Sequence, residues 1–227
     1  MKKAVFWDFD GTLSTPNSEF KTALHRAAAD LGVQINPSNA ERFLSSAYSW
    51  KTPSISYPDV TKEMWWRTLF EKNEAFLRAE GIDGDIISDI NKLFRERLIK
   101  IENYSLYEDA ISALASLRDK GYSSYILTNN YPEITDNIAG LGLLPYIDGA
   151  IVSSHVGFEK PRAELYAYAK RAADAPDVCY MIGDNPIADI DGAKHAGMKT
   201  VYVHNGHIDT ADFCADTLAD AVEFCMQ

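Results

Sequence analysis

The sequence predicts an α/β fold, in which a parallel β-sheet has helices on both faces and an all-helical domain is inserted after the first strand. A buried strand is expected at residues 3–8, and about 80 residues with only helical patterns follow it. Helical and strand patterns then alternate to residue 204, as in parallel sheets whose strands are joined by helices. We therefore expect a core of residues 1–15 and 99–227 and a helical cap domain of residues 16–98.

The inserted segment shows four amphipathic helical patterns, which together indicate a small helical bundle. We expect the first helix within residues 18–32, ending at Gly32, because glycine is a common helix C-cap. The other three are expected at residues 37–48, 59–81 and 84–100.

Two aromatic features of the inserted segment bear on specificity. The loop of residues 47–59 is rich in aromatic and hydroxyl side chains and contains Lys51. We expect this loop to pack on the cap rather than to close over a substrate. Trp65 and Trp66 point about 100° apart on a helix, so we expect one to be buried and the other to line a cleft.

The alternating part of the chain predicts the rest of the sheet domain. Helices are expected at residues 107–121, 132–141, 162–173 and 187–196, and strands at residues 122–130, 149–154, 177–185 and 199–204.

The composition excludes several classes of protein. A net charge of −11 argues against a general nucleic-acid binder, which needs basic residues to neutralise phosphates. No apolar run approaches the roughly 20 residues that cross a bilayer, and Asp8 interrupts the apolar stretch that would otherwise resemble a signal peptide. Three scattered cysteines favour a reducing, cytoplasmic location. We expect a monomer or a weak dimer with no membrane partner.

Polar side chains follow each of the first four predicted strands, at the sheet edge where doubly wound folds bind ligands. Each alone has an ordinary explanation, such as a turn, a helix cap or a solvated lysine. Their occurrence in order at successive strand ends indicates one site. They are Asp8, Asp10, Thr128, Asn129, Asn130, Ser153, Ser154, Lys160 and Asp184.

The first strand ends in a pair of aspartates that suggests a metal ion. Residues i and i+2 of an extended segment face the same way, so Asp8 and Asp10 point toward one site. Two close carboxylates repel each other unless a cation lies nearby. Mg²⁺ prefers oxygen ligands, and Asp184 from a neighbouring strand end can supply another. Asp189 lies in the first turn of the next helix, which Pro186 is suited to open.

The pattern resembles the haloacid dehalogenase-like hydrolase superfamily, in its phosphatase branch. The matching segments are "DFDGTL" (8–13), "LTNN" (127–130), "GFEKP" (157–161) and "GDNPIAD" (183–189). These motifs span essentially the whole sheet domain, for which the resemblance implies a Rossmann-like core. The all-helical insertion resembles the small cap of the first subclass of this family.

The resemblance implies a Mg²⁺-dependent phosphatase that acts on a small phosphorylated metabolite through an aspartyl-phosphate. Phosphosugars, phosphoglycolate and nucleotides are all open as substrates. Asp8 would be the nucleophile and Asp10 the general acid and base. The phosphoryl group would be bound by Thr128, Lys160, Gly11 and the backbone near Asn129, and the metal by Asp8, Asp184, Asp189 and the Asp10 carbonyl.

Other activities of the same fold stay open at this stage. A phosphomutase uses the same groups. A haloacid dehalogenase needs neither a metal nor a protonated leaving oxygen, so Asp10 together with Asp184 argues against it. A phospho-accepting signalling module has a similar sheet, but about half this length and no helical insertion. One departure from the family pattern is Arg162, where an acid is frequent. Its presence is expected to weaken the following helix cap or, alternatively, to add a cation near the site.

Overall fold

In the computed structural model, which describes residues 1–227, six parallel strands form one sheet in the order β3-β2-β1-β4-β5-β6. The first strand therefore lies in the middle of the sheet, between β2 and β4. The strands are β1 (Lys3–Trp7), β2 (Ser123–Thr128), β3 (Gly149–Val152), β4 (Val178–Gly183), β5 (Lys199–Val203) and β6 (Phe213–Ala215).

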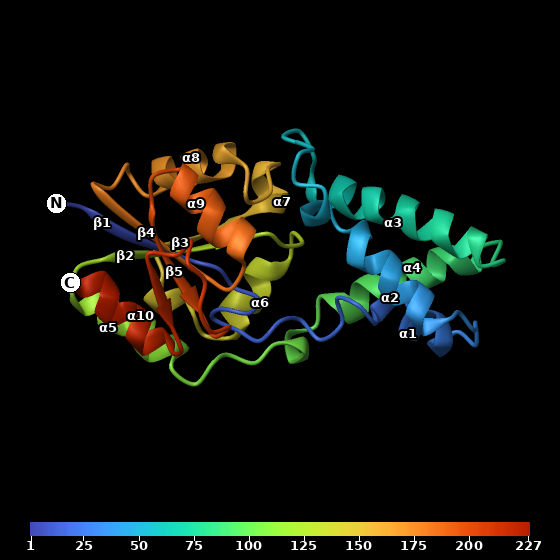
Figure 1. Cartoon of the computed structure of the whole chain (residues 1–227). Helices are drawn as coiled ribbons and strands as arrows, with labels where there is room; N and C mark the ends of the chain where they lie inside the picture. Colours follow the sequence, from blue (N-terminus) through green and yellow to red (C-terminus); the bar gives the residue numbers. More distant parts are fainter.

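Helices cover both faces of this sheet (Figure 1). Successive side chains of β1 point to opposite faces, and those from Ala4 to Trp7 are all buried. Phe6 belongs to a core cluster with α8 (Ala163–Ala172) and α9 (Gly192–His195). Trp7 belongs to a larger cluster that includes α5 (Ala110–Asp119) and α10 (Leu218–Met226). Burial on both faces explains why the strand reads as a continuous apolar run that stops at Asp8.

The inserted helices form a separate layer beside the sheet domain, joined to it by two connecting segments (Figure 1). Their apolar stripes meet in a shared core that contains Leu24, Leu44, Trp66 and Phe94, all buried. The insertion comprises α1 (Ala23–Asp30), α2 (Pro37–Ala47), the 3-10 turn η1 (Ser49–Lys51), α3 (Lys62–Ala79) and α4 (Ile86–Leu98).

The remaining elements are short. They are η2 (Ile101–Asn103), α6 (Ile134–Gly140), η3 (Leu144–Tyr146), α7 (Ser153–Val156) and the π-helical turn η4 (Pro186–Asp191). No helix in the chain is both long enough and apolar enough to span a membrane.

The predicted fold class is confirmed, and several element boundaries are corrected. The strand expected at 149–154 ends at Val152, because Ser153 begins α7. The helix expected at 187–196 is η4 followed by α9. Strand β6 and helix α10 were not expected. The division into residues 1–15 with 99–227 and residues 16–98 stays a prediction.

The expectation that one of the two adjacent tryptophans lines the cleft at the carboxyl edge of the sheet while the other is buried is wrong, because both are buried and neither lines it. Trp65 is 4% exposed and Trp66 is 1% exposed, and their rings pack edge to face with centroids 5.0 Å apart. Trp66 Nε1 donates a hydrogen bond to Glu133 at 2.9 Å, so one indole joins the cap to the sheet domain.

Candidate active site

The carboxyl ends of β1, β2 and β4 meet at one edge of the sheet and form the floor of a cleft of about 480 Å³. The cap covers this edge and supplies the opposite wall. Six residues predicted for the site line the cleft together: Asp8, Asp10, Thr128, Asn129, Lys160 and Asp184.

Lys160 joins two of the predicted carboxylates. Its ammonium Nζ lies 2.8 Å from Asp8 Oδ1 and 2.5 Å from Asp189 Oδ1, and the side chain is 2% exposed. Burial alone lowers a lysine pKa, but the two carboxylates outweigh it and raise the pKa of Lys160 above its ordinary value. The lysine therefore stays charged beneath the cleft floor.

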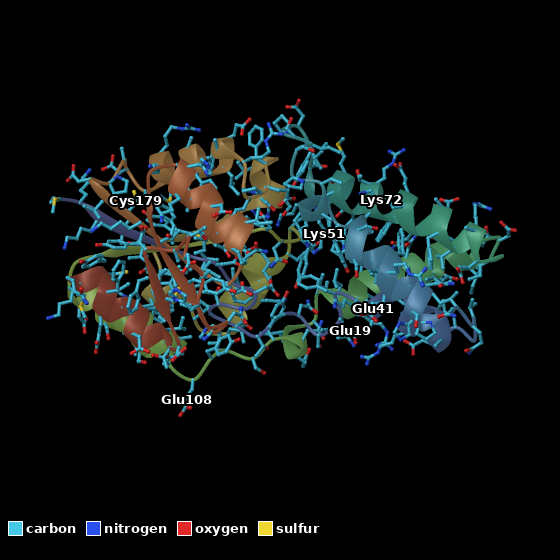
Figure 2. The ribbon with its side chains drawn as sticks, in the orientation of Figure 1. Glu19, Glu41, Lys51, Lys72, Glu108 and Cys179 are labelled. Atoms are coloured by element: carbon cyan, nitrogen blue, oxygen red, sulfur yellow. The ribbon has the colours of Figure 1, made fainter.

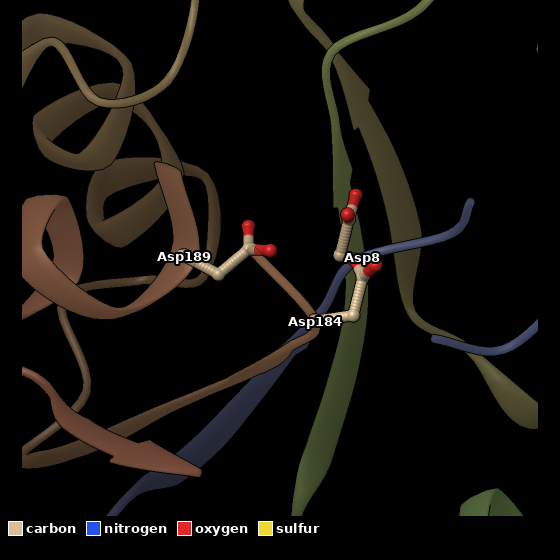
Figure 3. Close-up of side chains that lie close together, drawn as sticks. All are labelled: Asp8, Asp184 and Asp189. Atoms are coloured by element: carbon tan, nitrogen blue, oxygen red, sulfur yellow. The ribbon is translucent and has the colours of Figure 1, made fainter. Parts of the chain in front are cut away.

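The three aspartates Asp8, Asp184 and Asp189 lie close together, as Figure 3 shows. Carboxylate oxygens of Asp8, Asp184 and Asp189 all lie within 4.8 Å of one another. Burial, followed by repulsion from Asp8, raises the pKa of Asp184 to about 6 and the pKa of Asp189 to about 7. Three carboxylates facing one ammonium leave an excess of negative charge, and hard oxygen donors in this number fit a divalent cation.

Asp10 occupies a different environment from Asp8, although both follow the same strand. Its Oδ1 accepts a hydrogen bond from the Asn17 N–H at 2.9 Å, and its Oδ2 accepts one from Asn130 Nδ2 at 2.6 Å. Burial raises the pKa of Asp10 to about 7, the two donors oppose that shift, and the charges of Asp8 and Asp184 add to it. Asp10 is therefore suited to carry and release a proton near neutral pH.

The sequence patterns did not reveal Asn17 as a functional candidate, and they placed Asn130 at the site without predicting its contact with Asp10. Asn130 lies at the end of β2, beside the predicted Thr128 and Asn129, and its side chain crosses to β1. Asn17 follows the first motif, in the segment that leads into the cap. The spacing of the motifs carries no signal for either contact, because each joins segments whose approach depends on the fold.

Thr128 and Asn129 both line the cleft, but the Asn129 side chain is already engaged. Its Oδ1 accepts from the Lys160 N–H at 2.7 Å and its Nδ2 donates to the Lys160 carbonyl at 3.0 Å. This pair of hydrogen bonds fixes the backbone of Lys160 against the end of β2. Thr128 Oγ1 has only a long contact, 3.4 Å, with Asn130 Nδ2.

Gly11 allows the backbone after Asp10 to pass directly beside Asp184. Its φ of +83° lies in the left-handed region, and a Cβ atom at this position would be 2.4 Å from Asp184 Oδ2. Any larger residue would therefore displace a carboxylate of the three-aspartate group.

The cap loop between α2 and α3 lines the cleft, whereas we expected it to pack on the cap rather than to close over a substrate. Trp50, Lys51 and Pro53 line the cleft together with Asp8, Asp10 and Asp184. Figure 2 places Lys51 where the helical insertion faces the sheet domain. The loop also packs on the cap as expected, since the ring of Trp50 stacks on that of Trp65 in α3 with centroids 6.1 Å apart.

A buried carboxylate fastens this loop to the sheet domain. Glu159 is fully buried, and its Oε1 accepts hydrogen bonds from Ser49 Oγ at 2.5 Å and from the Tyr57 hydroxyl. The Tyr57 N–H also donates to the Gly157 carbonyl at 2.8 Å. Because Glu159 directly precedes Lys160, the cap loop and the site lysine are held by the same core segment.

Arg162 contributes to the same contact and does not line the cleft. Its Nη1 donates to the Ser54 carbonyl at 2.8 Å, and its Nη2 lies 2.6 Å from Glu164 Oε1. It begins α8 without a side-chain capping bond, as expected from the loss of an acidic residue there.

The fold and the cleft together define a class of protein: an α/β protein with a Rossmann-like sheet, whose acidic site lies at the carboxyl edge of the sheet beneath a helical cap. The model of the haloacid dehalogenase-like hydrolase family matches residues 2–197. The chain belongs to this family.

Two curated relatives are a phosphatase and a nucleotidase by name. The phosphoserine phosphatase of Thermus thermophilus is 36% identical over 172 residues, which are 74% of this chain and 68% of that protein. The pyrimidine 5'-nucleotidase PynA of Streptococcus pneumoniae is 32% identical over 211 residues, which are 91% of this chain and 86% of that protein.

A solved structure shows the same fold over the full length. The HAD-hydrolase YfnB from Bacillus subtilis, bound to magnesium, aligns with a TM-score of 0.76 and 18% identity, covering 100% of this chain and 99% of that one. At this identity the likeness shows the fold alone, including the helical insertion after the first strand.

Proposed function

We propose that the protein is a Mg²⁺-dependent phosphatase that hydrolyses a small phosphomonoester through an aspartyl-phosphate. One observation carries the proposal: two aspartates from one strand end have opposite environments. Asp8 Oδ1 lies 2.8 Å from the Lys160 ammonium, whereas Asp10 accepts hydrogen bonds from Asn17 and Asn130, and burial raises the pKa of Asp10 to about 7. One is suited to be a nucleophile and the other a proton donor.

In the first step, a carboxylate oxygen of Asp8 attacks phosphorus and the bond from phosphorus to the leaving oxygen breaks. Asp10 gives its proton to that oxygen, so the alcohol leaves uncharged. In the second step, Asp10 takes a proton from water, and the water oxygen attacks phosphorus and displaces Asp8. Inorganic phosphate is released and both aspartates return to their starting states.

The other groups of the site fit supporting roles. The Lys160 ammonium would offset negative charge between Asp8 and the phosphoryl group. Thr128 Oγ1 is available to donate a hydrogen bond to a phosphoryl oxygen, because its contact within the protein, from Asn130 Nδ2, is long at 3.4 Å. Asn129 would act through Lys160, whose backbone it fixes.

The donor set fits Mg²⁺, with Asp8, Asp184 and the Asp10 carbonyl as ligands. Both oxygens of Asp189 already accept hydrogen bonds, from Lys160 Nζ at 2.5 Å and from the Asn185 N–H at 3.0 Å. Asp189 would therefore lie behind the metal ligands and would not coordinate the ion itself. A bound Mg²⁺ ion would reduce the electrostatic repulsion between an anionic nucleophile and an anionic substrate.

Removal of divalent metal tests this proposal. With a panel of phosphorylated metabolites and an aryl phosphate, we expect phosphate release in Mg²⁺, a loss of about 10²-fold or more after exhaustive chelation, and recovery when Mg²⁺ is returned. The reason is that Asp8, Asp184 and the substrate otherwise repel one another. Full activity after chelation would contradict the metal assignment, and no phosphate from any ester would contradict the function.

A glycine substitution tests the metal site by a separate route. We expect Gly11→Ala to raise the Mg²⁺ concentration needed for half-maximal activity by about tenfold, since the new Cβ displaces Asp184. Gly32→Ala is a matched control, because Gly32 has a φ of +75° but no atom within 4 Å of the added Cβ. Left-handed strain should cost both variants about 1 kcal/mol in thermal unfolding, and Gly11→Ala should lose more because its Cβ also displaces Asp184. An equal Mg²⁺ requirement in the two variants would argue against Asp184 as a ligand.

A further inference from the structure

The two lysines that line the cleft differ in whether they form ion pairs with the protein. Lys160 is buried and paired with Asp8 and Asp189. Lys51 is the other lysine of the cleft lining; it is exposed, and its ammonium makes no ion pair or hydrogen bond with the protein. No arginine or histidine lines the cleft. Lys51 is therefore the free positive charge of the site.

The position of Lys51 separates it from the phosphoryl site. The acidic groups and Lys160 lie at the strand ends that form the floor, whereas Lys51 comes from the cap wall opposite. The lining also includes the apolar side chains of Pro16, Phe20 and Trp50. A substrate whose phosphate rests on the floor therefore meets apolar side chains and the Lys51 cation in the same cleft.

The loop that carries Lys51 is ordered by the core itself. Ser49 and Tyr57 flank Lys51 and both bond to Glu159, the residue before Lys160. This carboxylate is 0% exposed, and its Oε2 accepts no hydrogen bond, so the contact is sequestered from water. Because the loop is anchored on both sides of Lys51, less conformational entropy is lost when Lys51 binds a ligand than would be lost by a free loop.

We infer that Lys51 binds a second anionic group of the substrate, so that the substrate is a small phosphomonoester carrying a carboxylate or a second phosphate at its other end. The inference rests on the proposed function, which it narrows from any small phosphomonoester to this class. A neutral alcohol leaves Lys51 without a partner, whereas an anionic end forms a charge-assisted hydrogen bond at the cap wall.

The test compares three esters that share a two-carbon frame: ethyl phosphate, phosphoglycolate and ethane-1,2-diol bisphosphate. We expect wild-type kcat/KM to favour one or both anionic esters over ethyl phosphate, and Lys51→Met to reduce that preference about tenfold, mainly through KM. The two anionic esters distinguish a carboxylate from a phosphate. Lys62→Met, which removes an exposed lysine of the cap outside the cleft, should leave the preference and the rates unchanged.

Binding measured by calorimetry keeps the inference testable even without turnover. In an Asp8→Asn background, the anionic esters should bind more tightly than ethyl phosphate, and adding Lys51→Met should remove most of the difference. The inference would be overturned if the tighter binding of the anionic esters survived Lys51→Met. It would also be overturned if the Asp8→Asn protein with Lys51 intact bound the anionic esters no more tightly than ethyl phosphate. Hydrolysis of ethyl phosphate with no anionic preference would overturn the subsite alone, whereas the absence of phosphate release from every ester would overturn the proposed function.

Discussion

Replacing Asp8 with asparagine is expected to lower phosphate release by roughly 10⁴-fold or more while the fold is retained. The amide is nearly isosteric with the carboxylate but is a far weaker nucleophile. Lys160 keeps its ion pair with Asp189, so the buried ammonium is not left without a partner. The rate with an aryl phosphate and the circular-dichroism melting curve check the two parts of this prediction.

A matched control separates loss of the nucleophile from loss of charge. Asp119→Asn removes one exposed carboxylate at the end of α5, far from the cleft lining, and should leave the rate unchanged. Mass spectrometry after an acid quench should detect one added phosphate on the wild-type chain and none on Asp8→Asn. Normal turnover by Asp8→Asn would show that another group attacks phosphorus.

Asp10→Asn is expected to have an effect that depends on the leaving group. An alkyl phosphate leaves as a poor alkoxide, so loss of the proton donor should slow the first step by roughly 10²–10⁴-fold. A nitrophenolate leaves readily without a proton, and the first step should then suffer much less. The asparagine can still accept hydrogen bonds from Asn17 and Asn130 through its carbonyl oxygen, which helps to preserve the local structure.

The second step gives this prediction a kinetic signature. Attack of water on the aspartyl-phosphate still needs Asp10 as a base, whichever ester formed it. Asp10→Asn should therefore release a burst of nitrophenol, near one equivalent per enzyme, followed by slow turnover. Equal losses for alkyl and aryl esters without a burst would mean that Asp10 serves the metal or the geometry instead of carrying the proton.

The order of the motifs along the chain was sufficient to predict the fold class and the gathering of the strand-end residues. Apolar runs stop at Asp8, Thr128 and Gly183, and parallel strands carry whatever follows them to the same edge of the sheet. This reasoning works because both the period of the pattern and the polar stop are local properties. The same local logic predicted the bundle, since each cap helix has its own apolar stripe.

The C-terminal elements show where local patterns fail. Strand β6 has three residues, of which Phe213 is exposed and Cys214 partly exposed, so no buried run marks it. Its identity as a strand depends on pairing with β5. The boundary at Val152 is similar, because Ser153 enters a helix in which its hydroxyl accepts from the Asn130 N–H at 3.2 Å.

Only the tertiary structure decided how the cap meets the site. The sequence by itself determined the sheet, the insertion and the acidic strand ends. It did not determine that Asn130 would hold Asp10, or that Glu159 would bind the loop carrying Lys51. Glu159 and Ser49 are 110 residues apart, and their contact depends on the path of two connecting segments. Such contacts leave no periodic trace in a single sequence, because burial of a polar pair is decided by packing and not by the residues beside it.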